Sequence, residues 1–173
     1  MANKKSGMSL GKLILTIATI VLAVATCLPL FVNVWNGVTT YGDTSKAAEI
    51  GGYFEDYSPV AESFKLADAT FMDWASMIAG IALIVALVGA ALYIVGAIMS
   101  FVSNGKLATG LCKIGAFVML VAGVVVFVAS LLFVLPTATM GSMSMSTALG
   151  FGAWVGFLAP IGAGVLGIMA NRK

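Results

Sequence analysis

Long runs without a charged residue divide this chain. Leu13–Val34, Trp74–Val102 and Ile114–Leu135 contain 22, 29 and 22 residues, and none is Asp, Glu, Lys or Arg. The last uncharged stretch, after Lys113, is interrupted by Pro136 and a run rich in Ser and Thr, which places a fourth apolar span beyond it. A bilayer core needs about 20 apolar residues per helix. The pattern predicts an all-α integral membrane protein, a single tetraspan domain over 1–173 with spans at about 13–34, 74–102, 114–135 and 148–169.

The remaining segments are predicted to be two outer loops, 35–73 and 136–147, and one cytoplasmic loop, 103–113. In the first outer loop, Gly37–Gly42 is rich in β-branched residues and favours a short strand. Thr44–Ile50 favours one or two helical turns, which would complete a small extracellular α/β cap. Ser58-Pro59 suits the start of a helix that continues into the second span. The second outer loop is expected to fold against the first.

Composition agrees with a membrane protein and excludes several kinds of chemistry. Hydrophobic residues make up 61% of the chain and charged residues 9%, and the mean hydropathy is +1.08. Soluble domains contain about 25% charged residues. There is no His, and two Cys cannot form a zinc site or a disulfide framework. We therefore expect no catalytic residue, no cofactor and no metal. The net charge of +2, without a long basic run, argues against a nucleic-acid partner.

The basic residues indicate the orientation. Seven of the nine lie outside the two outer loops, whereas all seven acidic residues lie in the first outer loop. Because Lys and Arg favour the cytoplasmic side, we expect a multi-pass protein of the plasma (cytoplasmic) membrane with both termini in the cytoplasm. A cleaved signal peptide ending near Ala23-Val24-Ala25 is the alternative for the first span. The seven basic residues are Lys4, Lys5, Lys12, Lys106, Lys113, Arg172 and Lys173.

Small residues recur at intervals of four in two spans, which places them on one face of each helix. Small residues let membrane helices approach closely. Such a face can pack within the bundle, join a neighbouring subunit or line a ligand path, and the sequence leaves these three alternatives open. These helix-packing or interface candidates are Ala148, Gly152, Gly156 and Gly164 in the fourth span and Ala82, Ala86 and Ala90 in the second.

Aromatic and acidic residues meet in the first outer loop, which is bracketed by Trp35 and Trp74, as expected of aromatic residues at a membrane surface. A solvated acidic surface over packed aromatic residues is one interpretation. A divalent-cation site and a protein contact are the others. The candidates for recognition are Tyr53, Phe54, Glu55, Asp56 and Tyr57.

The layout resembles the claudin/PMP22-like tetraspan membrane proteins. Leu28-Pro29-Leu30 before Trp35, and Gly152-Ala153-Trp154-Val155-Gly156 in the last span, are the local similarities. The first outer loop lacks the Gly-Leu-Trp sequence and the Cys pair of that family, so the loop disulfide is not implied. The resemblance implies architecture only, because fold analogy does not carry function.

No ionisable residue lies in the cores of the four spans, which weighs against a proton-coupled transporter or an intramembrane enzyme. We therefore expect a non-enzymatic protein that acts by self-assembly or as a subunit of a membrane complex. Its partners would be the lipid bilayer and further copies of itself or other membrane-protein subunits. The alternative is a channel or transporter subunit that prefers cations, with the acidic loop as its vestibule.

Overall fold

The computed structural model describes residues 9–41, 43–53, 69–102, 105–134, 137–140 and 143–172. Four of its helices are long and apolar enough to cross a membrane, which confirms the all-α four-helix bundle. They are α1 (Leu10–Ala25), α3 (Ala69–Val102), α4 (Lys106–Val134) and α5 (Phe151–Ala170).

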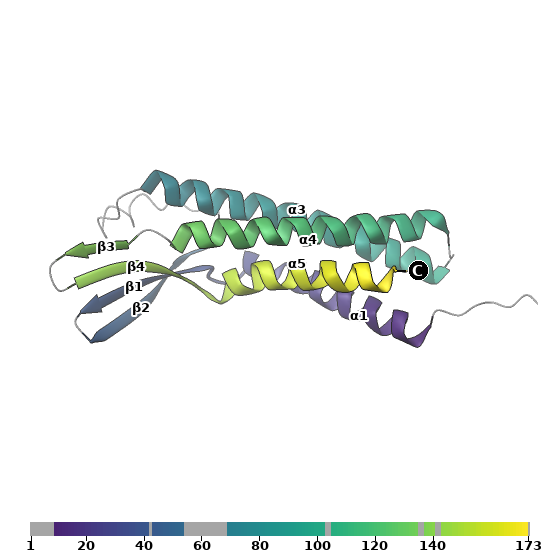
Figure 1. The fold of residues 1–173 in the computed structure, drawn as a ribbon, viewed down its shortest axis with the longest axis horizontal. Helices are drawn as coiled ribbons and strands as arrows, with labels where there is room; N and C mark the ends of the chain where they lie inside the picture. The colour runs from purple at the N-terminus through teal and green to yellow at the C-terminus, as the bar shows by residue number, and fades with distance from the viewer. Residues whose placement is uncertain are drawn as a thin grey trace, which may run out of the picture.

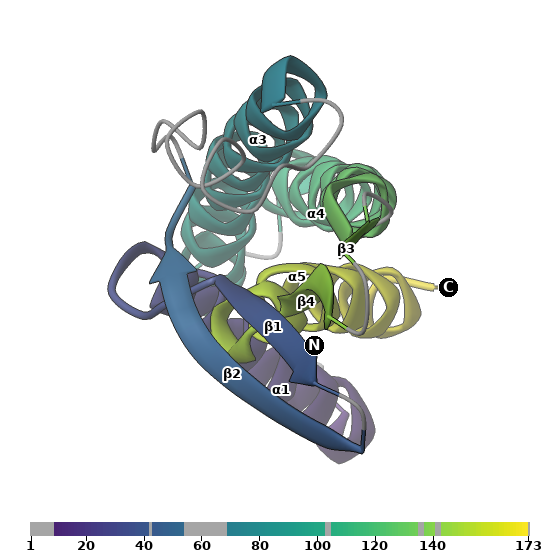
Figure 2. The ribbon, with the colours of Figure 1, turned by 90° about the vertical axis from the view of Figure 1, so that its left-hand side faces the viewer.

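The four helices run along the long axis of the molecule, and a small sheet extends from one end (Figure 1). Seen along that axis, α3 lies beside α4, α4 beside α5, and α5 beside α1 (Figure 2). The first residue of α1 and the last residue of α5 lie at the end opposite the sheet. The chain therefore crosses the bundle an even number of times and places its two outer connections together.

Each helix differs from the span predicted for it at one end or at both. α1 stops at Ala25 and is followed by the 3₁₀ turn η1 (Leu28–Leu30), whose Pro29 has no N–H to continue an α-helix. α3 begins at Ala69, five residues before Trp74. α4 begins at Lys106, inside the segment assigned to the cytoplasmic loop. The predicted helix start at Ser58-Pro59 lies outside the described residues.

The cap is a sheet built from both outer connections. Its strands are β1 (Trp35–Tyr41), β2 (Thr44–Gly51), β3 (Thr137–Met140) and β4 (Met143–Leu149), in the antiparallel order β2-β1-β4-β3. The predicted strand at 37–42 is confirmed by β1 over residues 37–41, and residue 42 lies outside the described residues. The expected docking of the second loop on the first is confirmed by the β1–β4 pairing. The predicted helical turns at 44–50 are wrong, because β2 occupies these residues.

Glycines set the distance between α3 and α4. A methyl group added at Gly115 would lie 2.6 Å from both the Gly89 carbonyl oxygen and the Tyr93 backbone nitrogen. One added at Gly96 would lie 2.8 Å from the Cys112 backbone nitrogen. Only glycine permits this separation, because the obstructing atoms belong to the backbone of the neighbouring helix.

Candidate functional site

The sheet is joined firmly to the bundle at the start of α5. The β1–β4 ladder begins with Trp35 opposite Leu149. It continues towards the helices through two hydrogen bonds, from Gly150 N to Val34 O at 2.7 Å and from Gly152 N to Asn33 O at 3.0 Å. The sheet is thus a continuation of the bundle rather than a separate appendage.

Trp35 anchors the base of the sheet between helices. Its side chain is fully buried and stacks on Phe133 of α4 with ring centroids 4.0 Å apart. Its indole Nε1 donates a hydrogen bond to Ser76 Oγ of α3 at 3.3 Å. Trp35 is therefore a core residue of the protein and exposes no surface to lipid or water. By contrast, Trp74 is exposed, as is Trp154 of α5.

The second outer connection is fixed to the same anchor. Thr147 of β4 donates a hydrogen bond from Oγ1 to the carbonyl oxygen of Phe133 at 2.9 Å, and its side chain is buried. Phe133 thus contacts β1 through its ring and β4 through its backbone. The two outer connections and α4 share one packed junction, which orients the sheet.

Tyr53 closes this junction from the end of β2. Its ring meets Trp35 edge-on, with centroids 5.6 Å apart, and it is buried. Its hydroxyl and that of Ser130 have no hydrogen-bond partner within the described part of the chain. Burial raises the pKa of Tyr53 above its ordinary value. The phenol therefore stays neutral at physiological pH.

Of the five predicted recognition residues, Tyr53 alone lies within the described part of the chain. Tyr53 belongs to the core, so it does not present its ring to a partner. The other four candidates, Phe54, Glu55, Asp56 and Tyr57, lie outside the described residues, and so does the cation site considered for them.

The small-residue candidates face inward. A methyl group at Gly152 would lie 2.7 Å from the Asn33 carbonyl oxygen, and one at Gly164 would lie 2.7 Å from the Leu120 backbone nitrogen. One at Gly156 would lie 2.6 Å from the Tyr53 hydroxyl. The second-span candidates, Ala82, Ala86 and Ala90, are all buried. These positions are occupied by contacts within the chain.

Ala148 is a correction among these candidates. It lies in β4, opposite Asn36 of β1, and not on the face of α5. α5 begins only at Phe151, after the N-cap Gly150, whose backbone N–H donates to the Val34 carbonyl oxygen and so continues the β1–β4 ladder.

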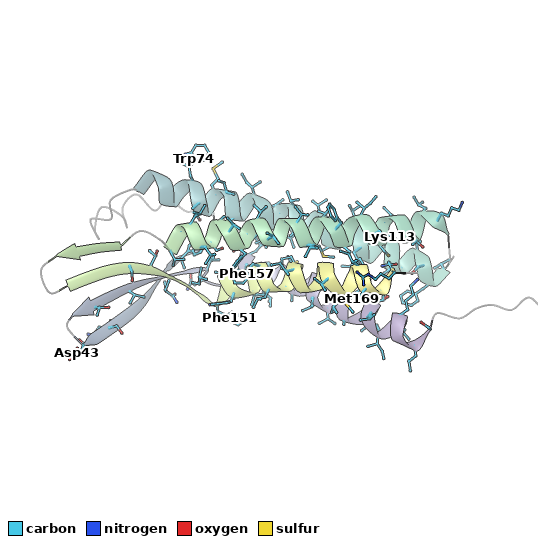
Figure 3. All side chains as sticks on the ribbon, viewed as in Figure 1. Asp43, Trp74, Lys113, Phe151, Phe157 and Met169 are labelled. Atoms are coloured by element: carbon cyan, nitrogen blue, oxygen red, sulfur yellow. The ribbon has the colours of Figure 1, made fainter. Side chains whose placement is uncertain are left out.

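Charge distinguishes the two ends of the molecule. Asp43 lies at the tip of the sheet, and Lys113 lies towards the opposite end of the bundle (Figure 3). Lys12 and Arg172 belong to the ends of the chain that lie away from the sheet. Lys46 of β2 is the one basic residue of the described chain at the sheet end, where Asp43 and Glu49 also lie.

The sequence contains a signal for each of the two hairpins in the sheet. Two residues separate β1 from β2 and two separate β3 from β4, and these are Gly42-Asp43 and Gly141-Ser142. Gly at the first position of a two-residue connection is typical of the type II′ hairpin turn. Both hairpins could have been predicted from this pattern.

Comparison with known proteins adds no assignment. The sequence matches no known protein-family model, and a search of curated proteins gave no match.

Proposed function

We propose that this chain is a non-enzymatic membrane protein that acts by assembly, as a homo-oligomer or as a subunit of a larger membrane complex, and that the sheet carries the contact. What supports this is the strand order β2-β1-β4-β3, because β2 and β3 each have one edge unpaired by any strand in the described residues. An unpaired strand edge offers a row of N–H and C=O groups to another strand.

The bundle supports this choice of surface. The small-residue faces that could have joined subunits already pack within the chain. The sheet, in contrast, extends beyond the helices (Figure 1). A contact through the sheet leaves the bundle unchanged, whereas a contact through the glycine faces would require the helices to separate.

The channel alternative has less support. Thr16 and Thr19 of α1 are buried, but their hydroxyls donate to the carbonyl oxygens of Lys12 and Leu15, both at 2.8 Å. Thr26 does the same with Leu22 at 3.1 Å. All three threonines are also almost wholly inaccessible to solvent, so no open water-filled path runs along them in the described structure.

Native mass spectrometry of the protein in a mild detergent and in native-lipid discs tests the assembly. We expect a discrete multiple of 17.7 kDa, or a defined complex with another subunit. A monomer under both conditions, with no partner retained, would overturn the proposal.

A proline in β2 tests the surface. In a two-residue hairpin the pair flanking the turn exchanges both hydrogen bonds, and the pattern alternates along the ladder. We therefore expect the Ala47 N–H to point to the open edge and the Ala48 N–H to point to β1. Ala47→Pro should lower the association constant roughly tenfold, because one edge donor is lost.

Two matched variants complete this test. Ala47→Ser keeps the edge N–H and should assemble like the unmodified protein. Ala48→Pro should instead weaken the β1–β2 pairing. If Ala47→Pro assembles as well as Ala47→Ser, the contact lies elsewhere on the molecule.

A further inference from the structure

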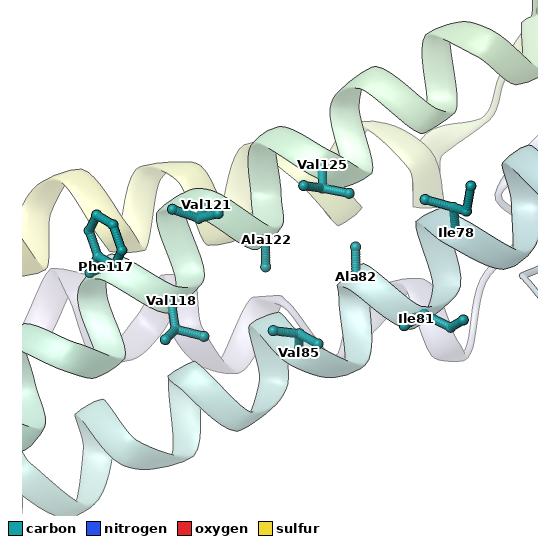
Figure 4. A pocket seen from close by; sticks show the side chains of 9 residues that line it. All are labelled: Ile78, Ile81, Ala82, Val85, Phe117, Val118, Val121, Ala122 and Val125. Carbon is teal, nitrogen blue, oxygen red and sulfur yellow. The ribbon is translucent and has the colours of Figure 1, made fainter.

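A groove of about 400 Å³ runs between α3 and α4. Ala82 and Ala122 face each other at its floor, and larger apolar side chains form its walls (Figure 4). The floor residues are buried, whereas most of the wall residues are exposed on the outer surface of the bundle. The groove therefore opens to the membrane and not to the bundle interior. Its walls are Ile78, Ile81 and Val85 of α3 and Phe117, Val118, Val121 and Val125 of α4.

The groove exists because the backbones of α3 and α4 are in contact on one side of it. Gly89 and Gly115 bring the two backbones together. The small side chains of Ala82 and Ala122 leave the space between the helices unfilled. The β-branched residues beside them form the walls of this space and do not fill it. The cavity is thus a consequence of the packing that fixes this helix pair.

The dimensions of the groove favour a single hydrocarbon chain over a helix. A membrane-spanning helix is a cylinder about 10 Å wide and 30 Å long, or roughly 2,400 Å³. Helices in membranes also associate through small residues at their points of contact. Here the only small residues, Ala82 and Ala122, lie at the floor, and branched or aromatic side chains form the rim.

A basic side chain lies one helical turn from the Phe117 end of the groove. Lys113 and Phe117 are four residues apart on α4, so they lie on neighbouring turns of the helix, and the row continues through Val121 and Val125 with a turn of about 40° around the helix at each step. From Lys113 to Val125 the helix rises about 18 Å, at about 1.5 Å per residue. One leaflet of the bilayer core is about 15 Å deep. Lys113 is exposed, so its ammonium group is accessible at the end of this row.

We propose that the groove binds one acyl chain of an anionic phospholipid, from the leaflet at the Lys113 end of the bundle, with the lipid phosphate at Lys113. The chain lies along Phe117, Val121 and Val125 towards Ile78. The apolar walls recognise the hydrocarbon, and the lysine selects a headgroup with a net negative charge. The bound lipid fills the space that α3 and α4 leave open on their outer side.

Native mass spectrometry of the full chain tests this, after release from discs that contain equal amounts of phosphatidylglycerol and phosphatidylcholine. We expect one phosphatidylglycerol retained per chain. Val121→Phe should remove this retention, because the larger ring fills the groove from its rim. Val124→Phe is the matched control, since Val124 is equally exposed on α4 but does not line the groove.

The headgroup is tested separately. Lys113→Gln should lower the ratio of phosphatidylglycerol to phosphatidylcholine retained by about fivefold, the usual effect of one basic residue near an anionic membrane surface. Arg172→Gln removes the same charge from the end of α5 and should leave the ratio unchanged.

Three results would overturn the proposal. Equal loss in the Val121→Phe and Val124→Phe variants would mean non-specific surrounding lipid, and unchanged retention in Val121→Phe would exclude the groove. A dimer that Val121→Phe dissociates would mean that a second copy occupies it. If Val121→Phe fails to fold, Val85→Phe fills the groove from α3, with Val88→Phe as its control on the same helix.

Discussion

The α3–α4 pair and the α1–α5 pair differ in the atoms that set the distance between their helices. Between α3 and α4, the atoms nearest to an added methyl group at Gly115 belong to the backbone. Between α1 and α5, a methyl group at Gly162 would meet only Leu22 Cδ1, at 3.0 Å. The first contact is made by backbones that cannot yield, and the second by the flexible end of a side chain.

The lengths of the helices follow the same division. α3 and α4 have 34 and 29 residues, or about 51 and 44 Å, whereas α1 and α5 have 16 and 20, or about 24 and 30 Å. α1 is extended towards the sheet by η1, and α5 contains Pro160. The long pair is therefore a continuous, closely packed hairpin, and the shorter pair connects it to the sheet.

α1 uses threonine where α3 and α4 use glycine. Its inward face consists of Thr16, Thr19, Ala23 and Thr26, all buried. Because each threonine hydroxyl binds its own helix backbone, the γ-methyl group remains available for packing. The comparison teaches that the position of α4 beside α3 is fixed by backbone contact, whereas α1 is placed by side chains.

Gly115→Ala should break the tighter pair. The added methyl group cannot be accommodated without moving α3 away from α4, and overpacking of this kind costs up to about 3 kcal/mol. Reversible unfolding in mixed micelles would measure the loss of free energy of unfolding.

Gly110→Ala is the matched control in the same helix, because nothing lies within 4 Å of the added methyl group. It should raise the free energy of unfolding by about 0.5 kcal/mol, through the better helix propensity of Ala. Equal effects of the two variants would contradict backbone contact as the cause.

Gly156→Ala should have a smaller effect that a second substitution reverses. The added methyl group would lie 2.6 Å from the Tyr53 hydroxyl but 3.7 Å from the ring carbon that bears it. We expect a loss of about 2 kcal/mol in the free energy of unfolding. Tyr53→Phe removes only the obstructing oxygen, which has no hydrogen-bond partner in the described structure.

The double variant should therefore recover most of the stability that Gly156→Ala loses. A double-mutant cycle measures this coupling directly. Additive effects of the two substitutions would show that Tyr53 does not limit the approach to α5.

How far the sequence predicts this structure depends on the range of the contacts. The four spans follow from local hydropathy and charge, so they were predictable. β2 was not recognised because its Lys46-Ala47-Ala48-Glu49 sequence favours a helix, and pairing with β1 overrides that preference. The burial of Trp35 depends on Phe133, which is about 100 residues away, so no local sequence pattern predicts it.

The candidate site shows the same limit. The spacing of Gly152, Gly156 and Gly164 correctly indicated close contact, but the pattern cannot say which atoms occupy the other side. Gly89 and Gly96, which hold α3 to α4, are spaced by seven residues and therefore do not belong to the four-residue pattern. The groove beside them depends on how two helices cross, and it was therefore inaccessible to sequence reasoning.

Gly162→Ala should give the smallest effect and is the sharpest test of the comparison between the two helix pairs. The only atom that the methyl group meets is the end of the Leu22 side chain, which can rotate away. Its small strain should be offset by the gain in helix propensity, so we expect the free energy of unfolding to change by less than about 0.5 kcal/mol. When Gly162→Ala is made in a Leu22→Ala variant, which lacks the obstructing side chain, it should raise the free energy of unfolding, because only the gain in helix propensity remains. A loss as large as that of Gly115→Ala would mean that α1 and α5 are fixed as rigidly as α3 and α4, because only an immobile neighbour turns one methyl group into a large penalty.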